Sequence, residues 1–443
     1  ACQPSSQVVE EKVPVTDGKA RLAMFAKHQA MEQDSEFKDN KWQFLGPKNT
    51  SGRMTDTAIS ADKSVLYTAA ASGGVWRTTD DGDSWECVFE DEITTSIGDI
   101  AVAPTDKNIV WVGTGESNIF RSSHAGCGIY KSTDGGTTWQ HLGLENTGTI
   151  ARVVVHPTDP NIVYVAASGN EWTPNPERGV YKTIDGGTSW QMILQKDDLT
   201  GAIDFDMDPS DPNTLYASTW QRIRKRWNDP RTEAHYTGCS IHKSTDGGES
   251  WKEITEGLPI PAHRGRIGVD IARTNPSVVY AYIDDYEVVR EPTEEEKNDS
   301  YGLPSCGFIR GAQVFRSDNK GETWTRVTPL EDPVLLRLCN TYGWVFGQIT
   351  VDPTNEYRLY IMCVSMALSE DGGKSWEKVK ARVKRSAERI AGELLKLYAA
   401  RKVRTGFTFQ SVDDYMAEFE GGFPYEETPD QLKAIEDVRQ DMA

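Results

Sequence analysis

The chain has 443 residues, with 48 Lys and Arg against 67 Asp and Glu, which gives a formal net charge of −19 at pH 7. An acidic excess of this size argues against a broadly basic nucleic-acid surface. Hydrophobic residues make up 37% of the chain, and no apolar run approaches the ~18 residues that indicate a membrane span. The composition therefore predicts a soluble globular protein and argues against a membrane-spanning or wholly disordered one.

Residues 1–40 are interpreted as a tether and lead-in. The chain opens Ala1-Cys2-Gln3-Pro4-Ser5, which resembles the end of a bacterial lipoprotein signal followed by the cysteine that carries the lipid. This resemblance implies lipidation at Cys2, attachment to a membrane only through that lipid, and a location in the cell envelope or outside the cell. The alternative is an ordinary disordered terminus.

One octapeptide recurs through the first 376 residues, and it is the strongest signal in the chain. Its pattern is Ser/Thr-x-Asp-x-Gly-x-Ser/Thr-Trp, and its tryptophans are 51 to 73 residues apart. The six copies occupy residues 78–85, 132–139, 183–190, 244–251, 317–324 and 369–376. A fixed motif at this spacing predicts a chain built from repeated supersecondary units.

Two strand signals precede each copy and define the repeat. In the second repeat, residues 108–112 are apolar and β-branched, and residues 128–132 lead directly into the octapeptide. Pro-rich turns such as residues 156–160 and 208–212 separate one strand from the next. Three or four short antiparallel strands every 50 to 60 residues predict an all-β fold, a β-propeller of about six blades. The sixth blade is predicted to be incomplete, losing its final strand at residue 376.

The octapeptide itself has a mechanical explanation. Its Asp and Ser/Thr side chains suit the backbone of a tight hairpin, its Gly supplies a positive φ, and its Trp packs on the neighbouring strand. The fifth copy has Asn319 in place of Asp, a change that a hairpin tolerates and an acid catalyst does not. We therefore assign a structural role to the residues at this position: Asp80, Asp134, Asp185, Asp246, Asn319 and Asp371.

The octapeptides match the Asp-box, or BNR, repeat of sialidases, sortilin-type receptors and xyloglucanase-like hydrolases. The flanking sequences at residues 73–78, 96–104 and 178–183 resemble bacterial exported BNR-repeat proteins often labelled glycosyl hydrolases. The likeness covers residues 41–376 and implies an Asp-box propeller there. The first blade lacks the Arg-Ile-Pro signature of sialidases, and Gly52-Arg53-Met54 is at best a distant analogue, so sialidase activity is disfavoured.

The connection between the second and third strand signals is long in the four middle repeats: residues 114–127, 168–178, 218–239 and 283–310. Insertions at one position of a rotating repeat emerge on one face of the disc, which we expect to bind a glycan or protein ligand. Aromatic faces stack on sugars and charged groups fix orientation. The candidate binding residues are Arg121, His124, Trp172, Trp220, Arg222, Arg224, Trp227, His235, Tyr236 and Tyr286. The alternative is that these loops pack on themselves.

A glycoside hydrolase is the second hypothesis. Hydrolysis requires two carboxylates on either side of the scissile bond; Glu116, Glu171, Asp284 and Asp285 are eligible, but nothing in the sequence pairs them. No CxxC pair, zinc-type Cys/His cluster or EF-hand spacing is present, so no metal and no cofactor is predicted. The six cysteines after Cys2 could pair or stay free.

The pattern changes after Trp376, and residues 377–443 are predicted to be a separate helical segment. Residues 377–404 carry a net charge of +7 and residues 405–443 a net charge of −8. Apolar residues at helical spacing predict an amphipathic helix over residues 378–404, and Thr428-Pro429 suits the start of a second.

Residues 372–443 resemble the bacterial transcription-repair coupling factor, where this stretch joins the polymerase-contacting domain to the first motor lobe. The chain contains no GxxxxGK[ST] phosphate loop, so we expect no ATPase activity from it. An exported propeller and a cytoplasmic DNA translocase do not share a compartment, and we interpret the junction at residues 372–376 as a fusion of two sequences. The alternative is a genuine helical appendage. A fragment derived from a DNA-repair translocase is the third function hypothesis.

Overall fold

The computed structural model describes residues 17–40, 53–118, 123–223, 237–298, 308–339, 346–363 and 365–379. The chain divides into two units, residues 1–379 and 380–443. The second unit, with most of the predicted helical segment, lies outside the described residues.

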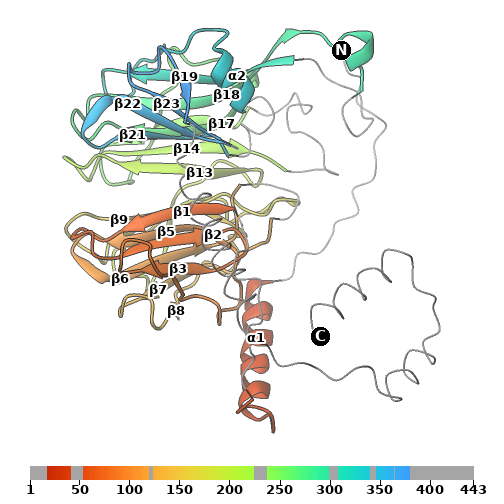
Figure 1. Ribbon diagram of the computed structural model, residues 1–443, viewed down its shortest axis with the longest axis vertical. Helices are drawn as coiled ribbons and strands as arrows, with labels where there is room; N and C mark the ends of the chain where they lie inside the picture. The colour runs from red at the N-terminus through yellow and green to blue at the C-terminus, as the bar shows by residue number, and fades with distance from the viewer. Residues whose placement is uncertain are drawn as a thin grey trace, which may run out of the picture. The chain divides into compact units, whose positions relative to one another are not determined.

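Six four-stranded antiparallel sheets make up the described part of the chain, and each keeps its strands in chain order. In Figure 1 the sheets follow one another from orange around β1 to blue around β22. This arrangement confirms the predicted six-bladed, all-β propeller. Blade 1 consists of β1(Met54–Ile59), β2(Leu66–Ala70), β3(Val75–Thr78) and β4(Glu86–Cys87), and blade 2 of β5(Ile97–Ala103), β6(Asp106–Thr114), β7(Ile129–Ser132) and β8(Gln140–His141). Blade 3 consists of β9(Ile150–Val155), β10(Val163–Ala167), β11(Gly179–Thr183) and β12(Gln191–Leu194), and blade 4 of β13(Thr200–Met207), β14(Leu215–Gln221), β15(Ser240–Ser244) and β16(Lys252–Glu253). Blade 5 consists of β17(Arg264–Ile271), β18(Val279–Arg290), β19(Phe308–Ser317) and β20(Thr325–Arg326), and blade 6 of β21(Gln348–Asp352), β22(Asn355–Met362), β23(Met366–Ser369) and β24(Glu377–Lys378).

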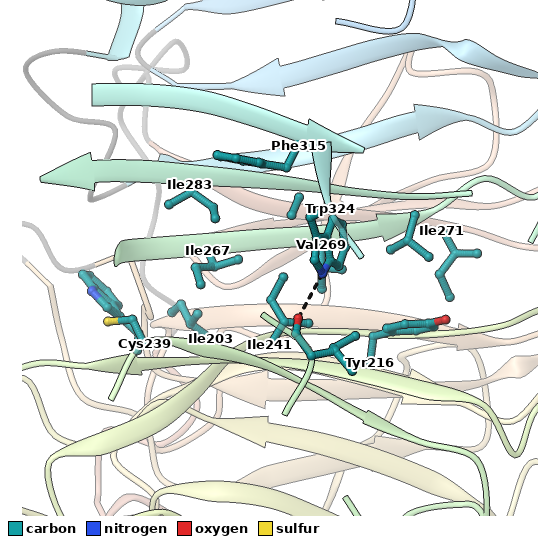
Figure 2. Packing of buried hydrophobic residues seen from close by; sticks show 14 of the residues in the cluster. Ile203, Tyr216, Cys239, Ile241, Ile267, Val269, Ile271, Ile283, Phe315 and Trp324 are labelled. Atoms are coloured by element: carbon teal, nitrogen blue, oxygen red, sulfur yellow. Dashed lines mark hydrogen bonds between the residues drawn. The ribbon is translucent and has the colours of Figure 1, made fainter. Parts of the chain in front are cut away.

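The first strand of each blade packs against the first strand of the next, in the order β1, β5, β9, β13, β17 and β21. These strands therefore line the axis, and the short fourth strands form the rim. The hydrophobic cores lie between successive blades. Figure 2 shows the core between blades 4 and 5, where Ile203, Tyr216 and Ile241 meet Ile267 and Val269.

The prediction that blade 6 loses its final strand is wrong. Leu368 pairs with Glu377 and Ala367 with Lys378, so β24 completes the sheet. The first residues of the predicted helix at 378–404 thus belong to the blade, because a hairpin closed by the Asp box brings them alongside β23. The remainder of that helix lies outside the described residues.

The lead-in contains a helix that the sequence reading missed. α1(Gly18–Gln33) begins at Asp17, whose carboxylate accepts a hydrogen bond from the Ala20 N–H at 3.3 Å. Arg21 Nη1 donates to the carbonyl oxygen of Gly126 at 2.6 Å, which ties the helix to the β6–β7 connection. The helix shows almost no amphipathic pattern because nearly all its side chains are exposed. The described residues also contain the short helices η2(Pro261–His263), η3(Glu294–Glu296) and α2(Pro333–Cys339).

The Asp boxes form tight hairpins held by hydrogen bonds to their aspartates. In the box of blade 4, Asp246 Oδ1 accepts the Ser250 N–H at 2.9 Å and the Ser244 hydroxyl at 2.7 Å. The glycine at the fifth position of each box has a positive φ, between 83° and 96°. Hydrogen bonds from the serine or threonine four residues later lower the pKa of four box aspartates to about 2: Asp80, Asp134, Asp185 and Asp246.

The boxes also connect neighbouring blades. The indole N–H groups of Trp139, Trp190 and Trp324 donate to carbonyl oxygens of the preceding blade, at 2.6, 2.8 and 2.9 Å. In the opposite direction, the Tyr67 hydroxyl donates to the carbonyl oxygen of Gly135 in the next box at 2.9 Å. Tyr164 and Tyr216 repeat this contact with the boxes of blades 4 and 5.

Aspartates on the inner strands join the blades near the axis. The Val153 N–H donates to Asp99 Oδ2 at 2.7 Å, and the Val351 N–H donates to Asp270 Oδ2 at 2.6 Å. Arg152 bridges two other blades, with Nε donating to Asp204 at 2.6 Å and Nη1 to Asp99 at 3.1 Å. Burial raises the pKa of the Asp99 and Asp270 carboxyls well above the ordinary value.

Candidate functional site

The connections between second and third strands emerge on one face, which we call the loop-rich face. The Gly115 N–H donates to Ser96 at 2.7 Å, the Ser168 N–H to Thr149 at 3.0 Å, and the Arg222 N–H to Leu199 at 2.9 Å. Each acceptor stands just before the inner strand of the same blade, so all three connections lie at the end of the blade where the inner strand begins. In blade 5, the end of β18 reaches the same level, because Asp285 pairs with Arg264. The Asp boxes occupy the opposite ends of the sheets.

Two of the long connections are shorter than predicted, because their strands continue. β14 extends to Gln221, and β18 and β19 form a long ladder up to Arg290 and Phe308. Trp220 therefore points into the core between blades 4 and 5, with 3% of its surface exposed, and Arg222 has 1% exposed. The expectation that these two side chains stand exposed in a loop is wrong.

Several of the predicted site residues belong to segments that the structure does not describe. Arg121, Arg224, Trp227, His235 and Tyr236 lie outside the described residues, as does Cys2. His124 is described and exposed, and its carbonyl oxygen accepts the Ser96 hydroxyl at 2.9 Å.

Near the axis, the predicted catalytic candidate Glu116 is engaged in an ion pair. Arg53 donates to both of its carboxylate oxygens, Nε at 2.9 Å and Nη2 at 2.6 Å, and the Glu116 side chain is fully buried. Next to it, Arg266 Nη1 donates to Asn118 Oδ1 at 2.9 Å, while the guanidinium lies 5.6 Å from the centre of the Trp220 ring. These contacts join blades 1, 2, 4 and 5 across the axis and give Glu116 a structural role.

The β10–β11 connection in blade 3 presents an aromatic side chain. Arg178 is buried and donates to the carbonyl oxygens of Ser168 at 2.9 Å and Asn170 at 2.5 Å, which fixes the backbone of this loop. Trp172 is 45% exposed on it, whereas Glu171 is buried. Of the two residues predicted here, Trp172 alone offers a broad accessible surface.

A pocket of about 440 Å³ lies at the loop-rich end of blade 5. Leu258, Pro259 and Phe315 supply apolar walls, and charged residues from η2, β18, β19 and β20 line the rest. Arg310 Nε donates to Glu287 at 2.6 Å and lies 3.8 Å from Asp285. The polar lining consists of His263, Asp285, Glu287, Arg310 and Arg326.

The two carboxylates of the pocket have opposite electrostatic environments. Burial, reinforced by the neighbouring Glu287, raises the pKa of Asp285, whereas the hydrogen bond from Arg310 lowers the pKa of Glu287. His263, Asp285 and Glu287 each place a possible ligand atom within 4.8 Å of the others. These three residues have the chemistry to hold a metal ion, but Arg310 already neutralises Glu287.

Of the predicted catalytic carboxylates, only Asp285 lines this pocket. Asp284 points to the other side of β18 and is 1% exposed, Tyr286 packs against Gly265, and Glu116 and Glu171 belong to other blades. Sequence reasoning missed Glu287, Arg310 and His263. The two-residue alternation along β18 could have linked Asp285 to Glu287, had residues 283–290 been recognised as strand.

The fold and its boxes define the chain as an Asp-box β-propeller. A family model for sortilin, described as "Sortilin, neurotensin receptor 3", matches residues 127–259. A GH74 enzyme from Niastella koreensis has the same fold, with 21% identity, a TM-score of 0.51, and coverage of 73% of this chain and 46% of that one. An ancestral GH74 enzyme gives 19% identity, a TM-score of 0.53, and coverage of 76% and 40%.

The predicted likeness to the coupling factor is also confirmed, over a short stretch. The transcription-repair-coupling factor of Myxococcus xanthus is 53% identical over 75 residues, and that of Bacillus subtilis 44% over 71 residues. These matches cover 17% and 16% of this chain, which spans 6% of the length of either relative. In the part of the chain that the structure describes, no helix is both long and apolar enough to cross a membrane.

Proposed function

We propose that the propeller binds a glycan or protein ligand on its loop-rich face, in the blade 5 pocket. The observation that supports this is the composition of the pocket, which is lined by two carboxylates, two guanidinium groups and the apolar side chains of Leu258, Pro259 and Phe315. Its volume of about 440 Å³ is within the ~300–1,000 Å³ range of small-ligand sites. Hydroxyl groups of a sugar, or polar groups of a peptide, would be fixed by the charged residues while apolar surface covers the walls.

The test is to screen the full chain on a glycan array and a peptide array, and to measure the affinity of the best ligand by calorimetry. Glu287→Gln and Arg310→Gln are each expected to weaken binding at least ~10-fold, since each removes a charged group from the pocket. Glu249→Gln lies in the Asp box on the opposite face and is the matched control. Ligand binding that neither pocket substitution changes would contradict the proposal.

A glycoside hydrolase is the second candidate, favoured by the Asp285–Glu287 pair. Their carboxylate oxygens lie within 4.8 Å, close to the ~5–5.5 Å separation of retaining enzymes. Because the pKa of Asp285 is raised and that of Glu287 lowered, Asp285 would act as the acid and Glu287 as the nucleophile.

Release of reducing sugar from a polysaccharide panel that includes xyloglucan tests this second function. Asp285→Asn and Glu287→Gln should each reduce kcat at least ~100-fold, and NMR of the first product should show retained anomeric configuration. If no polysaccharide of the panel is hydrolysed, the hydrolase candidate is contradicted and ligand binding is retained as the proposal.

For the whole polypeptide, we propose export to the cell envelope or beyond, with a lipid on Cys2, on the strength of the resemblance at the start of the chain. Metabolic labelling with a radioactive fatty acid should mark the protein but not its Cys2→Ser variant. The segment that resembles the coupling factor is proposed to lack ATPase activity of its own, so the full chain should release no phosphate from ATP, with or without DNA.

A further inference from the structure

The number of interblade cores differs from the number expected for a closed ring. Five hydrophobic clusters join blades 1 and 2, 2 and 3, 3 and 4, 4 and 5, and 5 and 6. A closed ring of six blades has six junctions, yet among the described residues no cluster joins blade 6 to blade 1, and β21 and β1 do not pack together as the other neighbouring inner strands do. Within the described residues, the two terminal blades thus each have one flank that no other blade covers.

The uncovered flank of blade 1 carries apolar side chains that are buried elsewhere. Trp76 is 36% exposed, whereas Tyr130, at the same position in blade 2, is 2% exposed against blade 1. Trp85 of the first box is 40% exposed, whereas Trp324 is 4% exposed and donates to the preceding blade. On the inner strand, Ile59 is 54% exposed.

The box glycines show the same difference. In blades 2 to 6, a Cβ added to the box glycine would approach a side chain of the preceding blade. Those side chains are Val88, Leu142, Ile193, Ile254 and Val327, in blade order. At Gly82 in blade 1, the three atoms nearest to such a Cβ all belong to Trp85 of the same box. The first box therefore lacks the contact with a preceding blade that the other five boxes make.

The opposite flank, on blade 6, is incomplete in a complementary way. Tyr360 occupies the position of Tyr67, Tyr164 and Tyr216, whose hydroxyls donate to the box of the following blade. In the described residues the hydroxyl of Tyr360 has no such acceptor, and its neighbour Met362 is 45% exposed. Blade 6 thus has the tyrosine that elsewhere contacts the Asp box of the following blade, but none of the described blades follows it.

We infer that the space between blade 6 and blade 1 is the binding site of one further Asp-box blade. Its outer strand would supply a carbonyl oxygen for Trp85 and aliphatic contacts for Trp76, and its box would accept the Tyr360 hydroxyl. The indole contact is present at three of the five described junctions, and the tyrosine contact is also present at three of them. Because both surfaces match recurring contacts between blades, another blade fits them better than an unrelated partner. This inference is independent of the ligand proposed for the pocket.

The first experiment is oxidative footprinting of the full chain, read by mass spectrometry, together with sedimentation velocity. Trp85 should be oxidised about tenfold faster than Trp324, the ratio of their exposed fractions of 40% and 4%, and the protein should sediment as a monomer. Equal protection of the two residues would overturn the inference, in favour of direct closure of the ring if the protein is a monomer and of a second copy on the flank if it is a dimer.

The second experiment supplies the blade. A copy of residues 96–148, which form blade 2 and its exit connection, is inserted before Arg53 in the full chain. Protection of Trp76, Trp85 and Met362 together with a higher Tm is expected, and a matched insert carrying Trp111→Asp in the copied blade should give neither. An inserted blade that folds but leaves Trp85 as reactive as before would overturn the inference.

Discussion

At the scale of single residues, an Asp box is held by one carboxylate together with the hydroxyl of its first residue, which in blade 4 accepts the Asp246 and Gly248 N–H groups. Both oxygens of Asp246 are used within four residues: Ser244 and the Ser250 N–H bond one oxygen, and the Ser250 hydroxyl bonds the other. Asn319 keeps this pattern with an amide, since its Oδ1 accepts the Thr323 N–H at 3.0 Å and its Nδ2 donates to the Thr323 hydroxyl at 2.9 Å. The role of these residues was predictable because every partner is near in sequence.

Substitution of a box aspartate should separate charge from hydrogen bonding. Asp246→Ala leaves the Ser250 N–H and two hydroxyls without their acceptor, so it should lower Tm clearly. Asp246→Asn rebuilds the arrangement seen at Asn319 and should lower Tm much less. Differential scanning calorimetry of the two variants decides the point, and equal losses would contradict the hairpin role.

The same carboxylates predict acid sensitivity. In the folded protein the pKa of Asp80, Asp134, Asp185 and Asp246 is about 2, below the ordinary value of ~3.9. A pKa that is lower in the folded state stabilises the fold above the ordinary value and ceases to do so as the pH falls toward the folded value. Urea unfolding should thus show stability decreasing from about pH 4 to about pH 2, with a shallower decrease for Asp246→Asn.

At the scale of elements, junctions between blades combine apolar cores with polar contacts between inner strands. Arg152 is the most connected of these residues, since it bonds Asp99 and Asp204 and lies 3.9 Å from Asp56. Arg152 occupies the inner-strand position at which blades 2 and 4 have Asp99 and Asp204. The repeat pattern in the sequence therefore did not predict that it bridges the blades.

Removing Arg152 should destabilise the fold more than removing a surface cation. Arg152→Met leaves carboxylates near the axis without their counter-charge, a change that costs ~3–5 kcal/mol in a fully buried site. Since 21% of the Arg152 side chain is exposed, we expect about 2 kcal/mol after solvent screening. Urea denaturation measures it, with Lys107→Met as the exposed control; equal effects would contradict the bridging role.

Box tryptophans should differ according to whether a blade precedes them. Trp324→Ala removes a buried ring and its hydrogen bond to Ile254, and such truncations cost ~3–5 kcal/mol. Trp85→Ala removes a ring that is already 40% exposed and should cost at least ~2 kcal/mol less. Equilibrium unfolding of both variants tests this, and equal losses would mean that blade 1 has a covered flank in solution.

At the scale of the whole molecule, stability should follow the number of neighbours of each blade. In the part of the chain that the structure describes, blades 1 and 6 have one interblade core each, and blades 2 to 5 have two. In repeat architectures such terminal units open first. Hydrogen exchange read by mass spectrometry should be faster in β2 and β22 than in β10 and β14, which hold the same position in interior blades. Uniform protection across the four strands would contradict this expectation.

From the sequence alone, the repeat, the strand order and the box hairpins could be predicted, because their signals and their hydrogen-bond partners lie within one repeat of about 50 residues. The common face of the long connections followed from the same regularity. Only the tertiary structure decided that Trp220 and Arg222 are buried and that Glu287, Arg310 and His263 join Asp285 in a pocket. Those outcomes depend on how far each ladder extends and on which elements meet, and the five junctions among six blades depend on packing between sheets, which no local pattern records.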